Sequence, residues 1–311
     1  MPPRVSLALP VYNGEKFIAE AICSILSQDY EDFELIITDN ASADGTESIC
    51  REFAASDPRV KYIRNERNLG AGPNFNLGFE LGLGEYFKWC ACDDKLSPDF
   101  IRACVSVLDR DQDAVLVYGT TQCIDENGRP IPLVGRMMPE LEGVGPARRF
   151  KTVIAEKGTC FEIFGLFRRD PLKKTSLFRP YYGTDVALLA DMSLIGTFVH
   201  VSGIVFYNRE HSSRSINLDK KERILWQSTD AKRKYSLEHI ILLKHLIEIC
   251  IRRRQAVSPL KTLATLLVWA LRPIQISRYA LELIGIGSPS AQNWLRGAGW
   301  RVLRILHIEL P

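Results

Sequence analysis

Polar residues that could bind a charged ligand follow the short apolar runs near the start of the chain. Asp39 follows one run, Asn68 lies in the turn after the next, and Asp93 and Asp94 follow a third. Adjacent carboxylates can hold a hard divalent cation, which in turn bridges phosphate oxygens. These residue types indicate a site for a nucleoside diphosphate, although each of them alone is also an ordinary turn or helix-cap residue.

The elements that must position these residues alternate in type. Segments with helical spacing of apolar residues, such as 15–27 and 97–108, separate the short apolar runs. The strands predicted from those runs are 5–9, 33–37, 60–63, 86–90 and 114–118. This alternation predicts an α/β fold with a mostly parallel sheet covered on both faces. Ligands bind beyond the carboxyl ends of the strands in such sheets, so the polar segments should meet along one rim.

Two common phosphate-binding motifs are missing from the sequence. It contains no glycine-rich loop ending in GK[ST], and no GxGxxG follows the first predicted strand. P-loop kinases and dinucleotide dehydrogenases are thereby disfavoured, and a metal and side chains would have to neutralise the phosphate charge. A nucleotidyltransferase would need a loop rich in Gly, Arg and Lys after the first strand, and PVYNGEKF is not such a loop.

The second part of the chain is less regular. Residues 120–160 show no clear period and predict loops. FEIFGLF, GTFVHV and GIVFYN predict further strands around one helix that starts near Asp185. From about Ile224 the pattern becomes helical and is dense in Arg and Lys.

Residues 5–46 and 64–101 carry a resemblance to a known family. They resemble the family 2 glycosyltransferases, and the resemblance is dense over 4–118, thinner to about 215 and absent beyond. It implies a GT-A fold, which is Rossmann-like with a mixed, mostly parallel sheet. It also implies inverting transfer of a sugar from a nucleotide-diphosphate sugar, UDP-sugars above all, to a hydroxyl of a glycan or lipid-linked acceptor.

The resemblance assigns donor-binding residues position by position. Those matching the segments that embrace the nucleotide are Pro10, Val11, Tyr12, Asp39, Asn68 and Asp93. Asp94 matches the residue that holds a divalent metal, Mn²⁺ or Mg²⁺, on the donor diphosphate. His211, in a segment similar to the family's Tyr-Arg-x-His-x-x-Ser element, would reach the metal or the diphosphate, although a lone His is as often an ordinary surface or core residue.

Asp185 matches the family's catalytic base at a helix start. A helix cap is the alternative role, because Asp is a favoured cap residue. One departure from the usual pattern lies at Pro73 and Asn74, where many members carry an Ala-Arg-Asn that helps to hold phosphate. Two further departures concern the catalytic motifs: Ala91 stands where the first Asp of Asp-x-Asp-Asp is usual, and Thr184 stands where Glu commonly precedes the base. These departures leave a second hypothesis open, namely a catalytically degenerate GT-A domain that acts as a binding or scaffold protein.

The sequence predicts two regions. Residues 1–215 form the catalytic domain, with a nucleotide-binding half at 1–118 and an acceptor half at 119–215, and residues 216–311 form a basic amphipathic helical region. Residues 212–311 hold 17 Lys and Arg against 7 Asp and Glu. Helices with Trp and Leu on one face and Arg on the other, including the stretch with Trp294 and Trp300, suit an anionic membrane surface.

Other partners for this region were weighed as well. The helices could instead pack on the catalytic sheet or on a second subunit, which would make a homo-oligomer. Nucleic acid is not expected, since no recognition helix or stacking sheet accompanies the charge.

Composition indicates a cytoplasmic protein. Hydrophobic residues make up 46% and charged residues 25% of the chain, and no apolar run reaches the roughly 18 residues of a membrane span. No secretory signal is visible, and none of the eight cysteines, Cys23 among those expected in apolar surroundings, forms a CxxC pair. A metal site at Cys90 and Cys92 fits no zinc spacing. We expect cell-envelope or exopolysaccharide synthesis, with peripheral attachment to the inner face of the membrane.

Overall fold

The computed structural model describes residues 2–135, 137–155, 160–214, 217–218, 220–227, 237–255 and 257–288. The terminal stretch with Trp294 and Trp300 lies outside the described residues.

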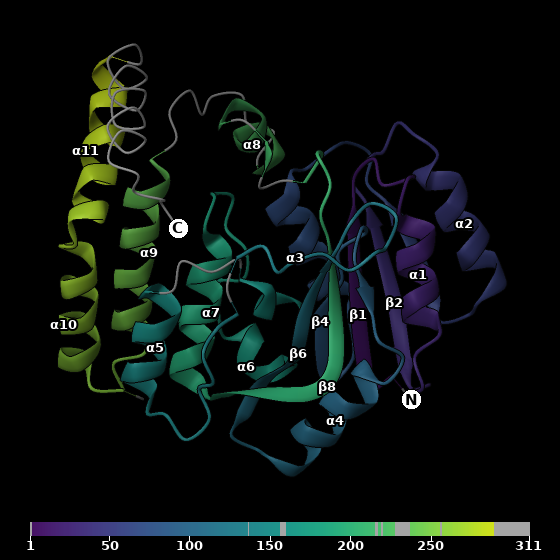
Figure 1. The fold of residues 1–311 in the computed structure, drawn as a ribbon, viewed down its shortest axis with the longest axis horizontal. Helices are drawn as coiled ribbons and strands as arrows, with labels where there is room; N and C mark the ends of the chain where they lie inside the picture. Colours follow the sequence, from purple (N-terminus) through teal and green to yellow (C-terminus); the bar gives the residue numbers. More distant parts are fainter. Residues whose placement is uncertain are drawn as a thin grey trace.

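A single eight-stranded sheet runs through the described part of the chain, in the order β3-β2-β1-β4-β7-β6-β8-β5 (Figure 1). The strands are β1 (Val5–Val11), β2 (Phe33–Asp39), β3 (Val60–Arg64), β4 (Tyr86–Trp89), β5 (Lys95–Leu96), β6 (Ala114–Ile124), β7 (Leu166–Arg168) and β8 (Thr197–Arg209). Strands β1 to β4 pair in parallel, as do β6 and β8, while β7 and β5 pair antiparallel to their neighbours. The predicted mostly parallel α/β sheet is confirmed.

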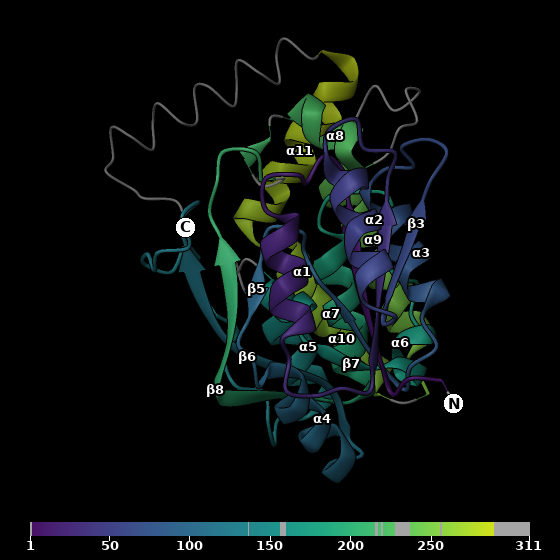
Figure 2. The same cartoon turned by 90° about the vertical axis from the view of Figure 1, so that its right-hand side faces the viewer.

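Helices lie on both faces of this sheet. They are α1 (Ile18–Leu26), α2 (Thr46–Ser56), α3 (Ala71–Leu81), α4 (Phe100–Arg110), α5 (Pro146–Ala155), α6 (Arg169–Lys173), α7 (Thr184–Ile195), α8 (Lys220–Gln227), α9 (Glu238–Arg252), α10 (Pro259–Ala270) and α11 (Pro273–Gly287), with one 3₁₀ turn, η1 (Phe161–Phe164). Figure 2 shows α1 and α2 in front of the sheet and α9 to α11 behind it.

The core consists of two hydrophobic clusters, one on each face. Successive side chains of a strand point to opposite faces, so Leu7 and Leu9 of β1 join the cluster under α1 and α4, whereas Ala8 joins the one under α3 and α7. Every residue of β1 and β2 is buried, as expected for strands covered on both sides. At Gly78 of α3 an added Cβ would lie 2.7 Å from the Ala8 Cβ, so a glycine permits this close helix-strand contact.

Three local predictions were wrong. Helix α5 lies in the segment expected to be loops, and its buried face includes Arg149, whose Nε donates a hydrogen bond to the Ser193 carbonyl oxygen at 2.8 Å. The segment FEIFGLF forms η1 before the short β7 rather than one strand. Cys23 is exposed instead of facing the core.

The C-terminal helices contribute to the core of the catalytic fold. Leu246 and Ile249 of α9 and Leu266 and Trp269 of α10 belong to the same cluster as α5 and α7. Asp191 of α7 is 1% exposed and pairs with the guanidinium groups of Arg252 and Arg253 at the end of α9. One face of the helical region therefore packs on the catalytic fold. No helix among the described residues has both the length and the apolar character to span a bilayer.

The buried carboxylate of Asp191 supports the first prediction. Asp191→Asn is expected to lower the free energy of unfolding by about 3 kcal/mol, because it leaves the guanidinium groups of Arg252 and Arg253 without their anion. Urea denaturation followed by circular dichroism measures this, with Asp170→Asn at an exposed position of α6 as the matched control. A difference between the two variants below about 0.5 kcal/mol would contradict the prediction.

Candidate active site

The carboxyl ends of three neighbouring strands meet at one edge of the sheet because the strands are parallel and in register. Val11 of β1 lies opposite Asp39 of β2, which in turn lies opposite Arg64 of β3. Strand β4 ends next to β1, and the turn with Asp93 and Asp94 follows it. The structure thus places the polar residues singled out in the sequence along one rim, as the strand pattern predicts.

Asp39 is fully buried at this rim and already holds several partners. Its Oδ1 accepts a hydrogen bond from the Ser42 backbone N at 2.8 Å. Its Oδ2 accepts from the Tyr62 hydroxyl at 2.6 Å and from Arg64 Nη1 at 2.9 Å. Burial raises the pKa of Tyr62, and the hydrogen bond to Asp39 raises it further. Asp39 therefore orients Tyr62 and Arg64, two polar groups at this edge of the sheet that sequence reasoning missed.

The other residues predicted to embrace the nucleotide base differ in exposure. Pro10 and Val11 are buried within β1, whereas Tyr12 is 47% exposed just beyond it. Tyr12 is therefore the member of this group whose ring is open to a ligand.

Asn68 belongs to a network of amides that shapes the loop between β3 and α3. Its Oδ1 accepts hydrogen bonds from Asn40 Nδ2 and from the Gly70 backbone N, both at 2.8 Å. Asn40 Oδ1 accepts from the Leu69 backbone N at 2.8 Å. Gly70 has φ of +86°, a value that glycine adopts without strain. Asn68 therefore stabilises the conformation of the loop between β3 and α3, at the edge of the sheet that bears the other polar residues.

Asp93 and Asp94 are adjacent in sequence but point to different partners. The Asp94 carboxylate is 6% exposed and faces β8, where it accepts hydrogen bonds from the Arg209 backbone N at 2.8 Å and from Asn208 Nδ2 at 3.2 Å. Asp93 Oδ2 lies 2.8 Å from His211 Nε2. The resemblance paired Asp94 with His211, whereas the structure brings His211 to Asp93 and uses Asp94 to hold the end of β8.

Arg209 fixes the geometry of this carboxylate-histidine pair. The side chain is 1% exposed, and its Nε donates to the Asp93 carbonyl oxygen at 2.8 Å. The guanidinium also pairs with Glu20 and lies 4.7 Å from the centre of the Phe17 ring, while the His211 ring contacts the same Phe17 at 5.0 Å. Arg209 stands two residues before His211 in the segment that resembles the family element, which is the signal that could have identified it.

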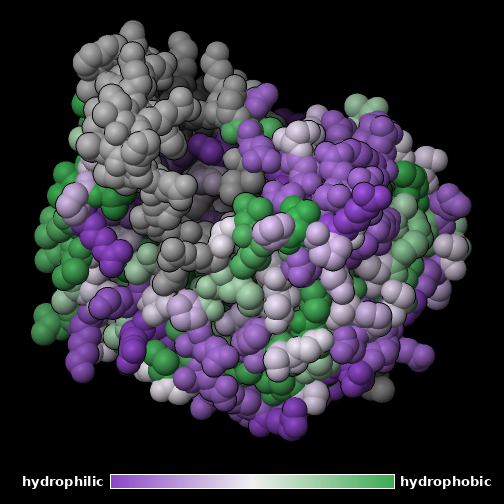
Figure 3. Space-filling model, viewed as in Figure 1, coloured by the Kyte–Doolittle hydropathy of each residue, from purple (hydrophilic) through white to green (hydrophobic). Residues whose placement is uncertain are grey.

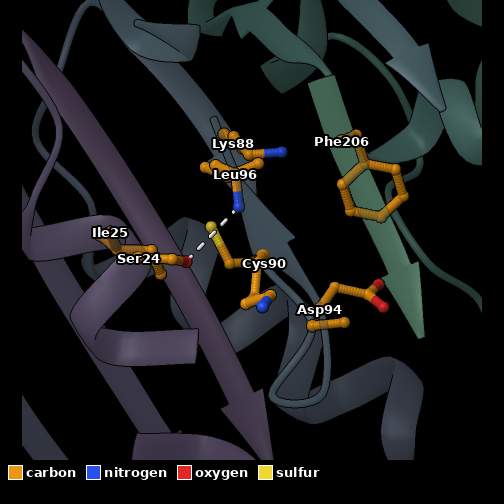
Figure 4. Close-up of a pocket in the computed structure, with 9 residues that line it drawn as sticks. Ser24, Ile25, Lys88, Cys90, Asp94, Leu96 and Phe206 are labelled. Atoms are coloured by element: carbon orange, nitrogen blue, oxygen red, sulfur yellow. Dashed lines mark hydrogen bonds between the residues drawn. The ribbon is translucent and has the colours of Figure 1, made fainter. Parts of the chain in front are cut away.

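A small cavity lies behind Asp94 (Figure 4). It has a volume of about 10 Å³, the room of one water molecule, so it cannot hold a sugar donor. Lys88 of β4 lines it, donates to the Phe164 carbonyl oxygen and lies 4.9 Å from the centre of the Phe100 ring. Complete burial lowers the pKa of this lysine, which sequence reasoning also missed. Lys88 supports the core beneath the rim.

Asp185 lies half-buried in the first turn of α7. Its Oδ1 accepts a hydrogen bond from the Val186 backbone N at 2.9 Å, and burial raises the pKa of the carboxyl group. Thr184 is buried, and its hydroxyl accepts from the Arg179 backbone N at 2.8 Å, so it stabilises the preceding turn. Gly183, with φ of +92°, allows the turn into the helix.

The loop before Asp185 is also held by α9. His245 is 1% exposed, and its two ring nitrogens lie 2.7 Å from the Ser176 hydroxyl and 2.6 Å from the Tyr181 hydroxyl. Burial lowers the pKa of His245 to about 4, so the ring is neutral near pH 7. The C-terminal helical region therefore helps to position the segment that carries the candidate base.

Asp93 and His211 are the residues whose chemistry fits a divalent metal. Among the residues that the structure describes, no cluster of three or more His, Cys, Asp or Glu could enclose an ion. One carboxylate oxygen and one imidazole nitrogen nevertheless suit Mn²⁺ or Mg²⁺ when substrate phosphates and water complete the coordination, as is usual for Mg²⁺. The two ligand atoms of Asp93 and His211 thus suit an ion that binds together with a diphosphate.

A mostly parallel α/β sheet with a carboxylate and a histidine beyond its strand ends suits a phosphate-bearing ligand. The sequence matches the model of glycosyl transferase family 2 over residues 6–176, more than half of the chain. The chain belongs to glycosyl transferase family 2, and it carries a glycosyltransferase domain.

Individual relatives and solved structures agree with this family. Chondroitin synthase of Escherichia coli is 36% identical over 129 residues, which cover 42% of this chain and 19% of the synthase. The chain thus spans about a fifth of the length of that synthase. It spans less than half the length of the uncharacterized glycosyltransferases of Rickettsia felis, Rickettsia typhi and Methanocaldococcus jannaschii that it also resembles.

Among solved structures, TarS of S. aureus with UDP-GlcNAc superposes with a TM-score of 0.54 at 16% identity, covering 91% of both chains. The mannosyltransferase PcManGT of Pyrobaculum calidifontis with GDP-Man and Mn²⁺ gives 0.53 at 18% identity, covering 97% of this chain and 81% of that one. The expected GT-A fold with C-terminal helices is confirmed.

Proposed function

We propose that this protein transfers a sugar from a nucleotide-diphosphate sugar to a hydroxyl group of a glycan or lipid-linked acceptor, with inversion at the anomeric carbon. The observation that carries the proposal is the contact of Asp93 with His211 at the carboxyl edge of the sheet, in a chain of this family. Ligands of open α/β sheets bind beyond the carboxyl ends of the strands, which supports a donor diphosphate next to these two side chains. Tyr12 and Arg64 would contact the nucleoside from the neighbouring strands.

The proposed reaction is a single displacement. Asp185 accepts the proton of the acceptor hydroxyl as the hydroxyl oxygen bonds to the anomeric carbon, and the bond from that carbon to the diphosphate breaks. The raised pKa of Asp185 makes its carboxylate a stronger base than an exposed aspartate. A divalent ion bound by Asp93 and His211 would supply positive charge near the departing diphosphate. The backbone N–H of Val186 holds the Asp185 carboxylate in place at the helix start.

The donor and acceptor classes rest on the relatives. TarS was solved with UDP-GlcNAc and PcManGT with GDP-Man, which supports a nucleotide-sugar donor and favours UDP-sugars without excluding GDP-sugars. The similarity to chondroitin synthase supports a glycan acceptor. We therefore place the protein in the synthesis of a cell-envelope polysaccharide or exopolysaccharide.

Donor-dependent thermal stabilisation tests the proposal. The full chain is mixed in turn with UDP-, GDP-, dTDP- and CDP-sugars, each with Mn²⁺, with Mg²⁺ and with a chelator. We expect one nucleotide class to raise the melting temperature only when metal is present, because a ligand that binds the folded state alone stabilises it. Hydrolysis of the same donor, measured as released nucleotide, then shows turnover.

Two outcomes would change the assignment. Stabilisation without hydrolysis or transfer to any candidate acceptor would favour the scaffold hypothesis, which Ala91 and Thr184 motivate. The Thr184 hydroxyl accepts a hydrogen bond from the Arg179 backbone N, which gives this residue a structural role in the turn before Asp185. Absence of stabilisation by every donor would contradict the proposed donor site.

A further inference from the structure

The outward sides of α10 and α11 are apolar. Leu260, Leu263, Leu267 and Val268 of α10 and Leu283 and Ile286 of α11 are between 38% and 80% exposed. Leu266 and Trp269 on the other side of α10 are buried against the fold. We refer to the six exposed residues as the α10–α11 outer face. Figure 3 shows hydrophobic atoms along the edge where Figure 1 draws these two helices.

The exposed apolar residues of α10 are spaced so that they form one continuous strip on the helix. Leu260, Leu263 and Leu267 follow one another at three and four residues, so they lie on one side of the helix. Contiguous apolar patches of this kind mark an interaction surface in proteins, whereas isolated exposed apolar residues do not. Packing on the catalytic fold therefore accounts for only one side of each helix.

The charges beside this face have one sign. Lys244, Arg254 and Lys261 are exposed on or between α9 and α10. Among the described residues of α9 to α11, Glu282 is buried against His239. The side chain of Glu248 is 40% exposed, but it pairs with Arg179. Within the described residues of α9 to α11, the carboxylate of Glu248 is therefore already paired with a cation, whereas those of Glu238 and Glu282 are buried.

We propose that the α10–α11 outer face docks on an anionic lipid surface. The leucine and isoleucine side chains would enter the boundary of the acyl chains, while Lys244, Arg254 and Lys261 meet lipid phosphates. A second copy of the chain is disfavoured as the occupant, because a two-fold contact would bring these same cations toward each other. This inference extends the proposed function by naming the surface near which a lipid-linked acceptor is met, and docking itself does not require sugar transfer.

Vesicle sedimentation with the full chain tests this inference. The vesicles are phosphatidylcholine alone or phosphatidylcholine with phosphatidylglycerol, and the readout is the bound fraction. We expect binding to the mixed vesicles only. Leu267→Glu and Leu283→Glu should each weaken it about tenfold, because a carboxylate cannot enter the acyl boundary. Lys261→Glu should also weaken it about tenfold or more, and the effect should shrink in high salt.

Leu83→Glu is the matched control, since Leu83 is 60% exposed and Leu267 is 59% exposed, but Leu83 lies on the catalytic domain after α3. It should bind as the unchanged chain does, and equal melting temperatures of all variants show that they fold. Binding that survives both leucine substitutions would overturn the inference. The inference would also be overturned if the unchanged chain did not bind vesicles but formed a dimer, seen by analytical ultracentrifugation, that Leu267→Glu dissociates. Donor-induced stabilisation, measured in parallel, reports on the proposed function independently.

Discussion

Asp185→Asn is expected to lower the rate of sugar transfer by a factor of about 10² to 10⁴, the range that a positioned general base supplies. The amide cannot accept the proton of the acceptor hydroxyl, yet its oxygen can still accept the hydrogen bond of the Val186 backbone N. The substitution therefore removes the base and keeps the hydrogen bond within the first turn of α7. Initial rates of transfer, with donor-induced thermal stabilisation as the measure of donor binding, check this prediction.

The stability of the same variant separates the two roles weighed for Asp185. The pKa of the folded carboxyl is raised by burial, so ionised Asp185 costs the folded state free energy. Its contribution is most favourable below the unfolded pKa and is lost as the pH rises through the folded value. Asp185→Asn should consequently leave the melting temperature at pH 7 unchanged or raise it. The cap role expected for Asp185 is wrong, because Gly183 is the N-cap of α7 and no side chain among the described residues caps this helix. If Asp185 had only a structural role in the first turn, Asp185→Asn would transfer normally and Asp185→Ala would lose about 1 kcal/mol of stability.

The pH dependence of transfer follows from the same shift. The carboxylate must be ionised to act as a base, so the rate should fall as the pH is lowered through a value above the ordinary range of aspartate. Asp170→Asn, at an exposed position, is the control and should keep the normal profile. A rate that declines only in the ordinary aspartate range would show that another group limits the reaction.

Asp93→Ala is expected to have the second largest effect, a loss of donor binding and transfer of about 100-fold or more with the fold preserved. Asp93 faces His211 at the rim and bears the charge proposed to hold the divalent ion beside the donor diphosphate. His211→Ala should cause a similar loss, and the double variant should lose less than the product of the two effects, because both residues act on one ion. Metal titrations of donor-induced stabilisation measure all three variants.

Asp94 provides the contrast for this experiment. Because its carboxyl group holds Asn208 and the Arg209 backbone, Asp94→Ala should lower the free energy of unfolding by about 1 to 3 kcal/mol, since it leaves these buried donors without their acceptor. If Asp94→Asn abolishes metal-dependent donor binding while Asp93→Ala retains it, the ion belongs to Asp94, as the resemblance implies. Equal donor binding by Asp93→Ala and the unchanged chain would contradict our assignment.

The sequence by itself determined the architecture of the nucleotide-binding half and the edge of the sheet that bears the site. Strands buried on both faces are near-continuous apolar runs, so β1 and β2 are evident without knowledge of their neighbours. Parallel strands bring their carboxyl ends to one side, which is why Asp39 and Asp93 could be assigned to a common rim. These properties depend on local pattern and on a general rule of sheet topology.

Local pattern failed where a polar residue is buried or a strand is interrupted. Arg149 lies on the buried face of α5, so that face does not look apolar in the sequence. Its guanidinium can be buried because it donates a hydrogen bond to the Ser193 carbonyl oxygen, a partner that is known only from the tertiary structure. Gly203, with φ of +95°, divides the sequence of β8, yet pairing with β6 resumes beyond a bulge between Gly119 and Thr120. The two predicted strands are therefore one.

Which of the two adjacent carboxylates faces His211 was decided by tertiary structure alone. Two adjacent aspartates have the same chemistry, and nothing near them in the chain distinguishes Asp93 from Asp94. The end of β8, more than a hundred residues away in sequence, turns Asp94 inward through Asn208 and leaves Asp93 facing His211. The C-terminal helices show the same dependence on tertiary structure. Their helical period is visible in the sequence, but burial of one side of α10 against α5 and α9 decides which leucines remain exposed.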